Sequence, residues 1–128
     1  MRVIQIVLLL TLSPISTKLL AQSTPIQDTG TFSNMYYSEE GGDAIGEEIR
    51  ILKGGVSYWV LFQYAEGPIY PPVLVQAVVK GSKISFKLPP SYEGFGEFSG
   101  TIHKSFLVGK FSEQPKPIKL KRGKSYWD

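Results

Sequence analysis

The chain's single histidine is the first residue that could carry acid–base or metal chemistry. His103 lies beside Ile102 and Lys104 at a predicted turn, and the chain contains no cysteine. A zinc site needs about three or four His, Cys or carboxylate ligands, so His103 would require acids from several different strands. The Gly-x-Ser-x-Gly turn that presents the nucleophile of many hydrolases is also missing from the sequence. We therefore expect no catalytic residue, no metal site and no cofactor, and the chain is not expected to be an enzyme.

Five acidic side chains cluster in one stretch of the sequence: Glu39, Glu40, Asp43, Glu47 and Glu48. Paired carboxylates can serve a glycosidase or bind calcium. The spacing here matches neither an EF-hand loop nor a defined catalytic pair. We favour the interpretation that these are solvated charges in a loop and at a strand edge.

Five basic side chains gather near the C-terminus: Lys116, Lys119, Lys121, Arg122 and Lys124. They could contact phosphates, anionic lipid headgroups or acidic glycans. We favour the alternative that lysines keep an edge strand soluble. Without residues 1–23 the net charge falls from +3 to +1, which lacks the basic excess of nucleic-acid binders, so we expect no nucleic-acid partner.

Two tyrosines are candidates for contact with a small molecule. Tyr70 and Tyr92 lie in the two longest proline-containing loops, where exposed rings can meet a ligand or a partner. Most other aromatic side chains fall in predicted strands and are expected to form the hydrophobic core. The candidate site therefore depends on a scaffold that brings distant loops together.

Short β-branched and aromatic stretches, separated by Gly, Pro and Ser, indicate that this scaffold is all-β and antiparallel. The pattern predicts eight strands, at residues 31–37, 45–53, 56–64, 73–80, 83–88, 95–103, 106–111 and 118–122. Gly54-Gly55 and Gly81-Ser82 are predicted two-residue hairpin turns. Consecutive strands with short loops favour an up-and-down meander that closes into a small β-barrel, because closure removes exposed edges. Three glycines within strands are expected to permit bulges or sharp bends: Gly96, Gly100 and Gly109.

Alternation of side chains assigns the two faces of each strand. The predicted strands at 56–64 and 73–80 are apolar on both faces, unlike the strand at 83–88, where lysine and serine occupy one face. The apolar side chains expected to point outward from these two strands are Trp59, Leu61, Leu74 and Val78. Another part of the chain, a partner or a second copy should cover this outer face.

The N-terminal segment predicts export. A positive Met1-Arg2 start precedes an apolar run at 3–12, which is too short to span a bilayer. Ala21-Gln22-Ser23 supplies the small-x-small pattern that a signal peptidase requires. We expect a signal peptide at 1–23, a flexible leader at 24–29 and a single domain at 30–128, with no transmembrane segment in the processed chain. The expected location is secreted or periplasmic.

The two ends of the predicted barrel resemble those of lipocalin-like, or calycin-like, barrels. Gly30-Thr31-Phe32 opens the first strand and Leu120-Lys121-Arg122 closes the last. In that superfamily a Gly-x-Trp motif packs beneath a basic residue of the final strand, and this contact closes one barrel end. Here Phe32 stands where tryptophan is expected, and the chain lacks the C-terminal helix of typical lipocalins. The short strands also resemble those of small secreted bacterial barrel domains with no assigned activity.

Two functions follow from these expectations. The first is a non-enzymatic binding module of lipocalin-like architecture for a small apolar ligand. Its expected ligand-binding residues, inside the barrel and at its rim, are Tyr58, Val60, Phe62, Tyr70 and Tyr92. The second is an envelope structural or protein-interaction domain that uses the outer apolar face to bind a partner or a second copy. An empty apolar cavity would favour the first function, and a solid interior with an exposed aromatic patch would favour the second.

Overall fold

The computed structural model describes residues 24–128, and the expected signal peptide at 1–23 lies outside the described residues. Within residues 24–128 the regular secondary structure is entirely β, as predicted. The strands of this part of the chain are β1 (Gly30–Ser33), β2 (Tyr36–Ser38), β3 (Asp43–Gly54), β4 (Ser57–Gly67), β5 (Val73–Lys80), β6 (Lys83–Lys87), β7 (Glu97–Ile102), β8 (Phe106–Phe111) and β9 (Ile118–Arg122).

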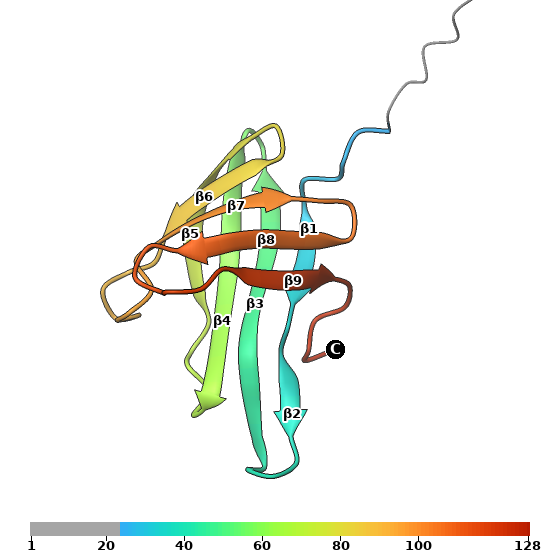
Figure 1. Cartoon of the computed structure of the whole chain (residues 1–128). Helices are drawn as coiled ribbons and strands as arrows, with labels where there is room; N and C mark the ends of the chain where they lie inside the picture. The colour runs from blue at the N-terminus through green and yellow to red at the C-terminus, as the bar shows by residue number, and fades with distance from the viewer. Residues whose placement is uncertain (1–23) are drawn as a thin grey trace, which may run out of the picture.

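The strands form one antiparallel meander that closes on itself (Figure 1). Each strand from β3 to β9 pairs with the next, and β1 pairs with both β9 and β3. Eight strands therefore complete the barrel, which confirms the predicted architecture. β2 is an additional short strand beside β3.

The sequence predicted one strand at 31–37, but the structure divides it into β1 and β2. Asn34 interrupts the strand: its side-chain amide donates to Glu47 Oε2 at 2.7 Å, and its Oδ1 accepts from the Glu47 backbone N–H at 2.6 Å. Nearby, Gly46 has a φ of +121°, and a Cβ added there would lie 2.8 Å from the Met35 Cα. The break depends on side-chain hydrogen bonds and a close backbone approach, which hydrophobic alternation does not report.

The two short hairpin turns have the expected glycine chemistry. Gly81 has a φ of +60° at the first position of the turn between β5 and β6. Gly55 has a φ of +63°, and because Gly54 pairs with Ser57, the turn between β3 and β4 consists of Gly55 and Val56. The predicted Gly54-Gly55 turn was therefore wrong by one residue. A positive φ at the first turn position alone is typical of type II′ turns.

Aromatic side chains fill much of the barrel interior. Phe62 and Phe98 are fully buried, and both pack against Phe111, with ring centroids 5.4 Å and 5.0 Å from it. Phe86 stacks on Phe98 at 5.0 Å. Contacts of this kind stabilise a core beyond the burial of apolar area.

Gly100 and Gly109 face each other across β7 and β8 and make room for a core ring. A Cβ added to Gly109 would overlap the Phe98 ring and would lie 2.6 Å from the Ser99 carbonyl oxygen. The pairing register runs through both glycines without a bulge. The reason for these two glycines is therefore the space that Phe98 occupies. Gly96, by contrast, has a φ of +76° immediately before β7.

Connections in a closed meander alternate between the two ends of the barrel. One end holds the turns at 55–56, 81–82 and 103–105 and the start of β1, and we call it the Arg122 end. The opposite end holds the connections at 68–72 and 88–96, together with the connection between β8 and β9, and we call it the mouth. β3 and β4 are the longest strands and extend past β7, β8 and β9, with β2 beside them (Figure 1).

Arg122 ties the segment that precedes β1 to its end of the barrel. Its guanidinium donates to the carbonyl oxygens of Thr29 and Gln27, each at 2.6 Å, and lies 4.5 Å from the centroid of the Phe32 ring. Burial lowers the pKa of Arg122. This is the contact expected from the lipocalin-like resemblance, with phenylalanine in place of tryptophan. The segment at 24–29, expected to be a flexible leader, is thus held by two of its carbonyl groups.

The outer face of β4 and β5 stays exposed within the described residues. Trp59, Leu74 and Val78 are 36%, 56% and 54% exposed, and Leu61 pairs with Leu74 between them. The predicted outward direction of these side chains is confirmed. None of the segments between residues 24 and 128 covers them enough to bury them.

The C-terminal segment covers part of β3 instead. The Ser125 hydroxyl donates to Glu48 Oε1 at 2.6 Å, and the Tyr126 backbone N–H donates to Glu48 Oε2 at 2.8 Å. Glu48 is only 2% exposed. The expectation that all five acids of the 39–48 stretch are solvated is therefore wrong for Glu48, whose carboxylate is satisfied by hydrogen bonds instead of water.

Candidate functional site

Of the five residues predicted to bind a ligand, Tyr58 lies away from the mouth, and Val60 and Phe62 lie in the packed interior. Tyr58 is at the Arg122 end, where its hydroxyl donates a hydrogen bond to the Asp28 carboxylate. Val60 and Phe62 point into the interior and have no accessible surface (0% each). Such side chains border no void as large as a water molecule, so a ligand could reach them only if core side chains moved. The barrel is a packed core at these two positions.

Tyr70 and Tyr92, the other two predicted residues, meet at the mouth. Their ring centroids are 6.1 Å apart, and Tyr64 adds a third ring 5.3 Å from Tyr70. Phe95 lies 4.8 Å from Tyr64 in an edge-to-face contact. Together the four rings line an open groove of about 320 Å³, which we call the mouth groove. Its remaining lining residues are Glu66, Ser91, Glu93 and Gln114.

The mouth groove has a rigid floor and an exposed wall. Tyr92 and Phe95 are buried, and each makes an edge-to-face contact with Phe62 at 5.6 Å, so the packed core supports the floor directly. The Tyr92 hydroxyl donates to the Pro71 carbonyl oxygen, and burial raises the pKa of this tyrosine. Tyr70 is 42% exposed and forms the wall that a ligand would meet first.

A second groove adjoins the first along the extended ends of β3 and β4. It measures about 410 Å³, and we call it the side groove. Both grooves are lined by Tyr64 and Glu66, so they meet at these two side chains. The other residues that line the side groove are Asn34, Tyr36, Ile45, Gly46, Glu47 and Ala65.

Both grooves carry negative charge. Glu66 and Glu93 line the mouth groove, and Glu47 lines the side groove; the described residues that line them include no lysine or arginine. The Tyr64 hydroxyl donates to Glu66. Desolvation, followed by this hydrogen bond, raises the pKa of Tyr64 well above its ordinary value, so its hydroxyl stays neutral. The arrangement suits a neutral or positively charged molecule with a flat apolar face, and it disfavours anions.

Sequence reasoning missed Tyr64, Glu66 and Phe95 as site residues. Tyr64 shares the inward direction of Phe62, two residues earlier, and was expected only to end its strand. β4 continues to Gly67, so Tyr64 and Glu66 project beyond the packed part of the barrel. A signal was present in the length of the β3–β4 hairpin, because a hairpin longer than its neighbours must protrude at one end.

The remaining candidates for chemistry are dispersed. His103 stacks on Phe106 with ring centroids 4.5 Å apart, at the Arg122 end. Between residues 24 and 128, no three His or carboxylate side chains gather closely enough to hold a metal ion. Of the basic residues near the C-terminus, Lys119 places its Nζ 4.4 Å from the Phe106 ring centroid, whereas Arg122 has the structural contacts described above.

Across the described residues, we find no helix with the length and hydrophobicity needed to cross a membrane.

Comparisons with protein-family models, curated proteins and solved structures found no match for this chain. The lipocalin-like resemblance therefore depends on architecture: the closed eight-stranded antiparallel barrel and the contact of Arg122 with Phe32. The functional argument depends on the geometry of the two grooves and of the outer face.

Proposed function

We propose that the chain is an exported, non-enzymatic binding module of lipocalin-like architecture that holds a small ligand in the mouth groove. The observation that carries this proposal is the gathering of Tyr64, Tyr70, Tyr92 and Phe95 around one open groove of about 320 Å³. Concave sites with aromatic walls and a few polar groups are where proteins most often bind small molecules. The ligand thus binds outside the packed interior, on the rings at the mouth.

The expected ligand has an apolar or aromatic face and no negative charge. Flat rings contact apolar groups well, and their faces also attract cations such as quaternary ammonium groups. Glu66 and Glu93 stand beside these rings and would repel a carboxylate such as that of a fatty acid. An apolar cation would be stabilised by the aromatic rings and by the carboxylates, whereas a neutral apolar molecule would be stabilised by the rings alone.

The carboxylates and the histidine support a binding function without catalysis. The Glu66 carboxylate accepts from Tyr64 and the Glu47 carboxylate accepts from Asn34, so both are engaged as structural acceptors. His103, the chain's only histidine, lies at the opposite end of the barrel. Export is supported by the apolar run at 3–12 and the Ala21-Gln22-Ser23 pattern of the sequence.

Three small probes of similar size test the proposal: benzyltrimethylammonium, benzyl alcohol and phenylacetate share a phenyl ring and differ in charge. Calorimetric or NMR titration of the full chain should give the tightest binding for the cation and the weakest for the anion. Tyr70→Ala removes the exposed wall and should weaken binding of the cation about two- to five-fold, the size of one exposed cation–π contact.

The matched control is Tyr37→Ala, which removes an exposed tyrosine from β2 that lines neither groove. It should leave the affinity for benzyltrimethylammonium unchanged. Equal affinity for the three probes would contradict the expected ligand class. An equal loss of affinity in Tyr70→Ala and Tyr37→Ala would show that the mouth groove is not the binding site.

The exposed outer face favours a second candidate function, an interaction domain. Trp59, Leu74 and Val78 are each more than a third exposed on one wall of the barrel, beside Leu61. Contiguous exposed apolar side chains mark interaction surfaces more often than isolated ones do. Sedimentation of the full chain and of Trp59→Glu at high concentration would test self-association through this face, and a monomer in both cases would contradict self-association.

A further inference from the structure

We propose that the outer wall formed by β4, β5 and β6, together with the adjacent turns of the Arg122 end, docks on an anionic phospholipid bilayer. The apolar part of this docking surface consists of Trp59, Leu74 and Val78, with Val56 at the tip of the β3–β4 turn. Val56 is 94% exposed, the highest value among the large apolar residues that are exposed. Side chains of this kind at a protruding edge can enter the interfacial region of a membrane.

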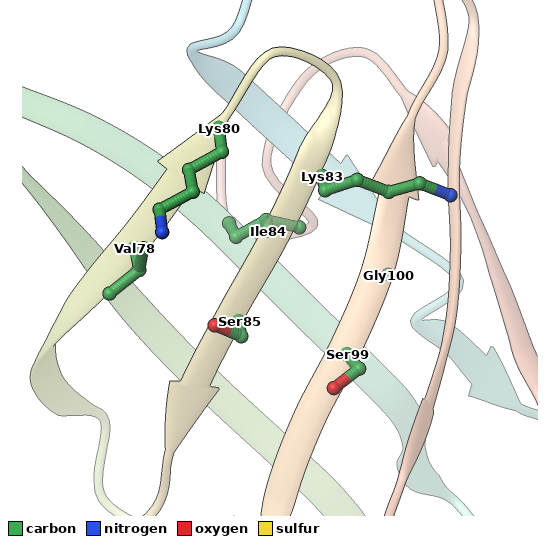
Figure 2. Close-up of a pocket in the computed structure, with 7 residues that line it drawn as sticks. All are labelled: Val78, Lys80, Lys83, Ile84, Ser85, Ser99 and Gly100. Atoms are coloured by element: carbon green, nitrogen blue, oxygen red, sulfur yellow. The ribbon is translucent and has the colours of Figure 1, made fainter.

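Lysines flank the apolar part. Lys80 and Lys83 stand directly opposite each other in the antiparallel pairing of β5 and β6. Figure 2 shows their side chains extending away from each other, Lys80 toward Val78 and Lys83 toward β7, so the hairpin presents one ammonium group on each side. An anionic surface that reaches both ammonium groups is therefore the occupant that best suits this end of the hairpin.

Figure 2 shows the shallow groove that these lysines border. It measures about 200 Å³, Ser85 and Ser99 line it together with the two lysines, and its lining residues include no carboxylate. Lys83 Nζ donates to the Thr101 hydroxyl at 2.8 Å, which leaves two of its three N–H donors for an anion. The groove suits a lipid phosphate, which needs positive charge and several hydrogen-bond donors.

Charge is distributed unevenly along the whole barrel. In or beside the turns at the Arg122 end lie Lys53, Lys80, Lys83, Lys104 and Arg122, and Asp28 and Asp128 also lie at that end. The connections at the mouth hold or adjoin more acids than bases: Glu39, Glu40, Asp43, Glu66, Glu93, Glu97 and Glu113, against Lys87, Lys110 and Lys116. A negatively charged membrane would attract the first end and repel the second. The mouth groove would then face away from the bilayer, open to solvent.

A second copy of the chain fits this surface less well than a bilayer. Two-fold dimers bury the same patch on both copies, so a dimer through the outer wall would bring Lys80 and Lys83 of one copy close to those of the other. Such like-charge contacts oppose association. The lysines thus favour an anionic occupant over self-association.

Co-sedimentation with lipid vesicles tests the docking surface. The full chain and its variants, which all share residues 1–23, are mixed with phosphatidylglycerol vesicles and with phosphatidylcholine vesicles as the baseline. Binding above this baseline should fall with salt. Lys80→Gln with Lys83→Gln should weaken it about 25-fold, since each lysine near an anionic surface contributes about five-fold.

The matched control is Lys110→Gln with Lys116→Gln, the same charge change near the mouth. It should weaken binding to phosphatidylglycerol by less than about three-fold. In a Trp127→Phe background, the emission of Trp59 should shift to the blue on phosphatidylglycerol vesicles, because this ring enters the interface. Circular dichroism of each variant confirms that the barrel is folded.

Three results would overturn the docking surface: no preference for phosphatidylglycerol, equal weakening in both lysine pairs, or an unchanged Trp59 emission. Self-association of the chain through Trp59 in sedimentation would replace the bilayer with a second copy as the occupant. None of these results bears on the mouth groove, because the probe titrations are done without lipid.

Discussion

Tyr64 is the residue on which most of the site geometry converges. Its ring contacts Tyr70 and Phe95, its hydroxyl donates to Glu66, and its side chain lines both grooves. The same environment favours the neutral phenol over the phenolate, because burial and an adjacent carboxylate both oppose a second negative charge. One side chain therefore links the aromatic wall with the acidic character of the grooves.

This pKa shift predicts how stability changes with pH. Tyrosines in the unfolded chain ionise near the ordinary value of 10.0, whereas Tyr64 in the native barrel keeps its proton to higher pH. The native state then binds more protons than the unfolded state, so the contribution of Tyr64 is complete below pH 10.0 and is lost as pH rises toward the native pKa. Urea unfolding between pH 8 and 11 should show a decline in the free energy of unfolding above about pH 10.

Tyr64→Phe should make that decline shallower, and Tyr37→Phe, the same change at an exposed tyrosine of β2, serves as the control. Residual decline in Tyr64→Phe is expected from Tyr92, whose pKa burial also raises. An identical slope in the wild-type chain and in Tyr64→Phe would contradict the arrangement described for Tyr64.

The sequence alone could predict whether a strand side chain points inward or outward, but not where along the barrel axis it lies. Tyr58 and Tyr64 both point inward from β4, yet six residues of strand separate them by about 20 Å. One lies at the Arg122 end and the other at the mouth. The position of a residue along the barrel axis depends on the register of its strand with the neighbouring strands, and this register could not be predicted from the single sequence.

At the scale of elements, period-two alternation was a sufficient guide because one face of most strands packs on a single core. The bounds predicted at 73–80, 106–111 and 118–122 agree with β5, β8 and β9. The prediction failed at Asn34, where a short polar side chain replaces strand pairing with its own hydrogen bonds. The bulges predicted at Gly100 and Gly109 are absent; both glycines leave space for the ring of Phe98, which lies in β7 two residues before Gly100.

The role of Gly109 in β8 gives a direct prediction. Gly109→Ala should lower the free energy of unfolding by about 2 kcal/mol, because the added methyl would overlap Phe98 and crowd the Ser99 carbonyl oxygen. Gly123→Ala is the control, since no atom lies within 4 Å of the position its Cβ would take. Its effect should stay within about 0.5 kcal/mol. Denaturant unfolding that gives equal values for the two variants would refute the close packing of β7 and β8.

At the scale of the whole molecule, the barrel separates two surfaces. The mouth has aromatic rings and carboxylates, whereas the outer wall of β4, β5 and β6 has apolar side chains, with lysines at its Arg122 end. The proposed ligand would contact the mouth groove and the proposed bilayer would contact the outer wall, so the two would use different surfaces of the barrel. The near-neutral net charge does not report this uneven distribution of charged residues, which follows only from the arrangement of the strands.

The packed interior distinguishes this barrel from one that encloses its ligand. Val60, Phe62 and Phe98 have no accessible surface, and Phe62 supports the floor of the mouth groove. An eight-stranded barrel is at the size where side chains alone can fill the interior. Here the ligand is proposed to bind against the outside of that packing, at the mouth.

The most direct test of this claim is the map of backbone amide shifts when benzyltrimethylammonium is added to the ¹⁵N-labelled full chain. We predict that the perturbed amides belong to the β4–β5 and β6–β7 connections, around Tyr70 and Tyr92, while those beside the buried Val60 and Leu107, farther from the mouth, stay unchanged. Perturbations centred on Val60 and Leu107 would place the ligand inside the barrel and contradict the account.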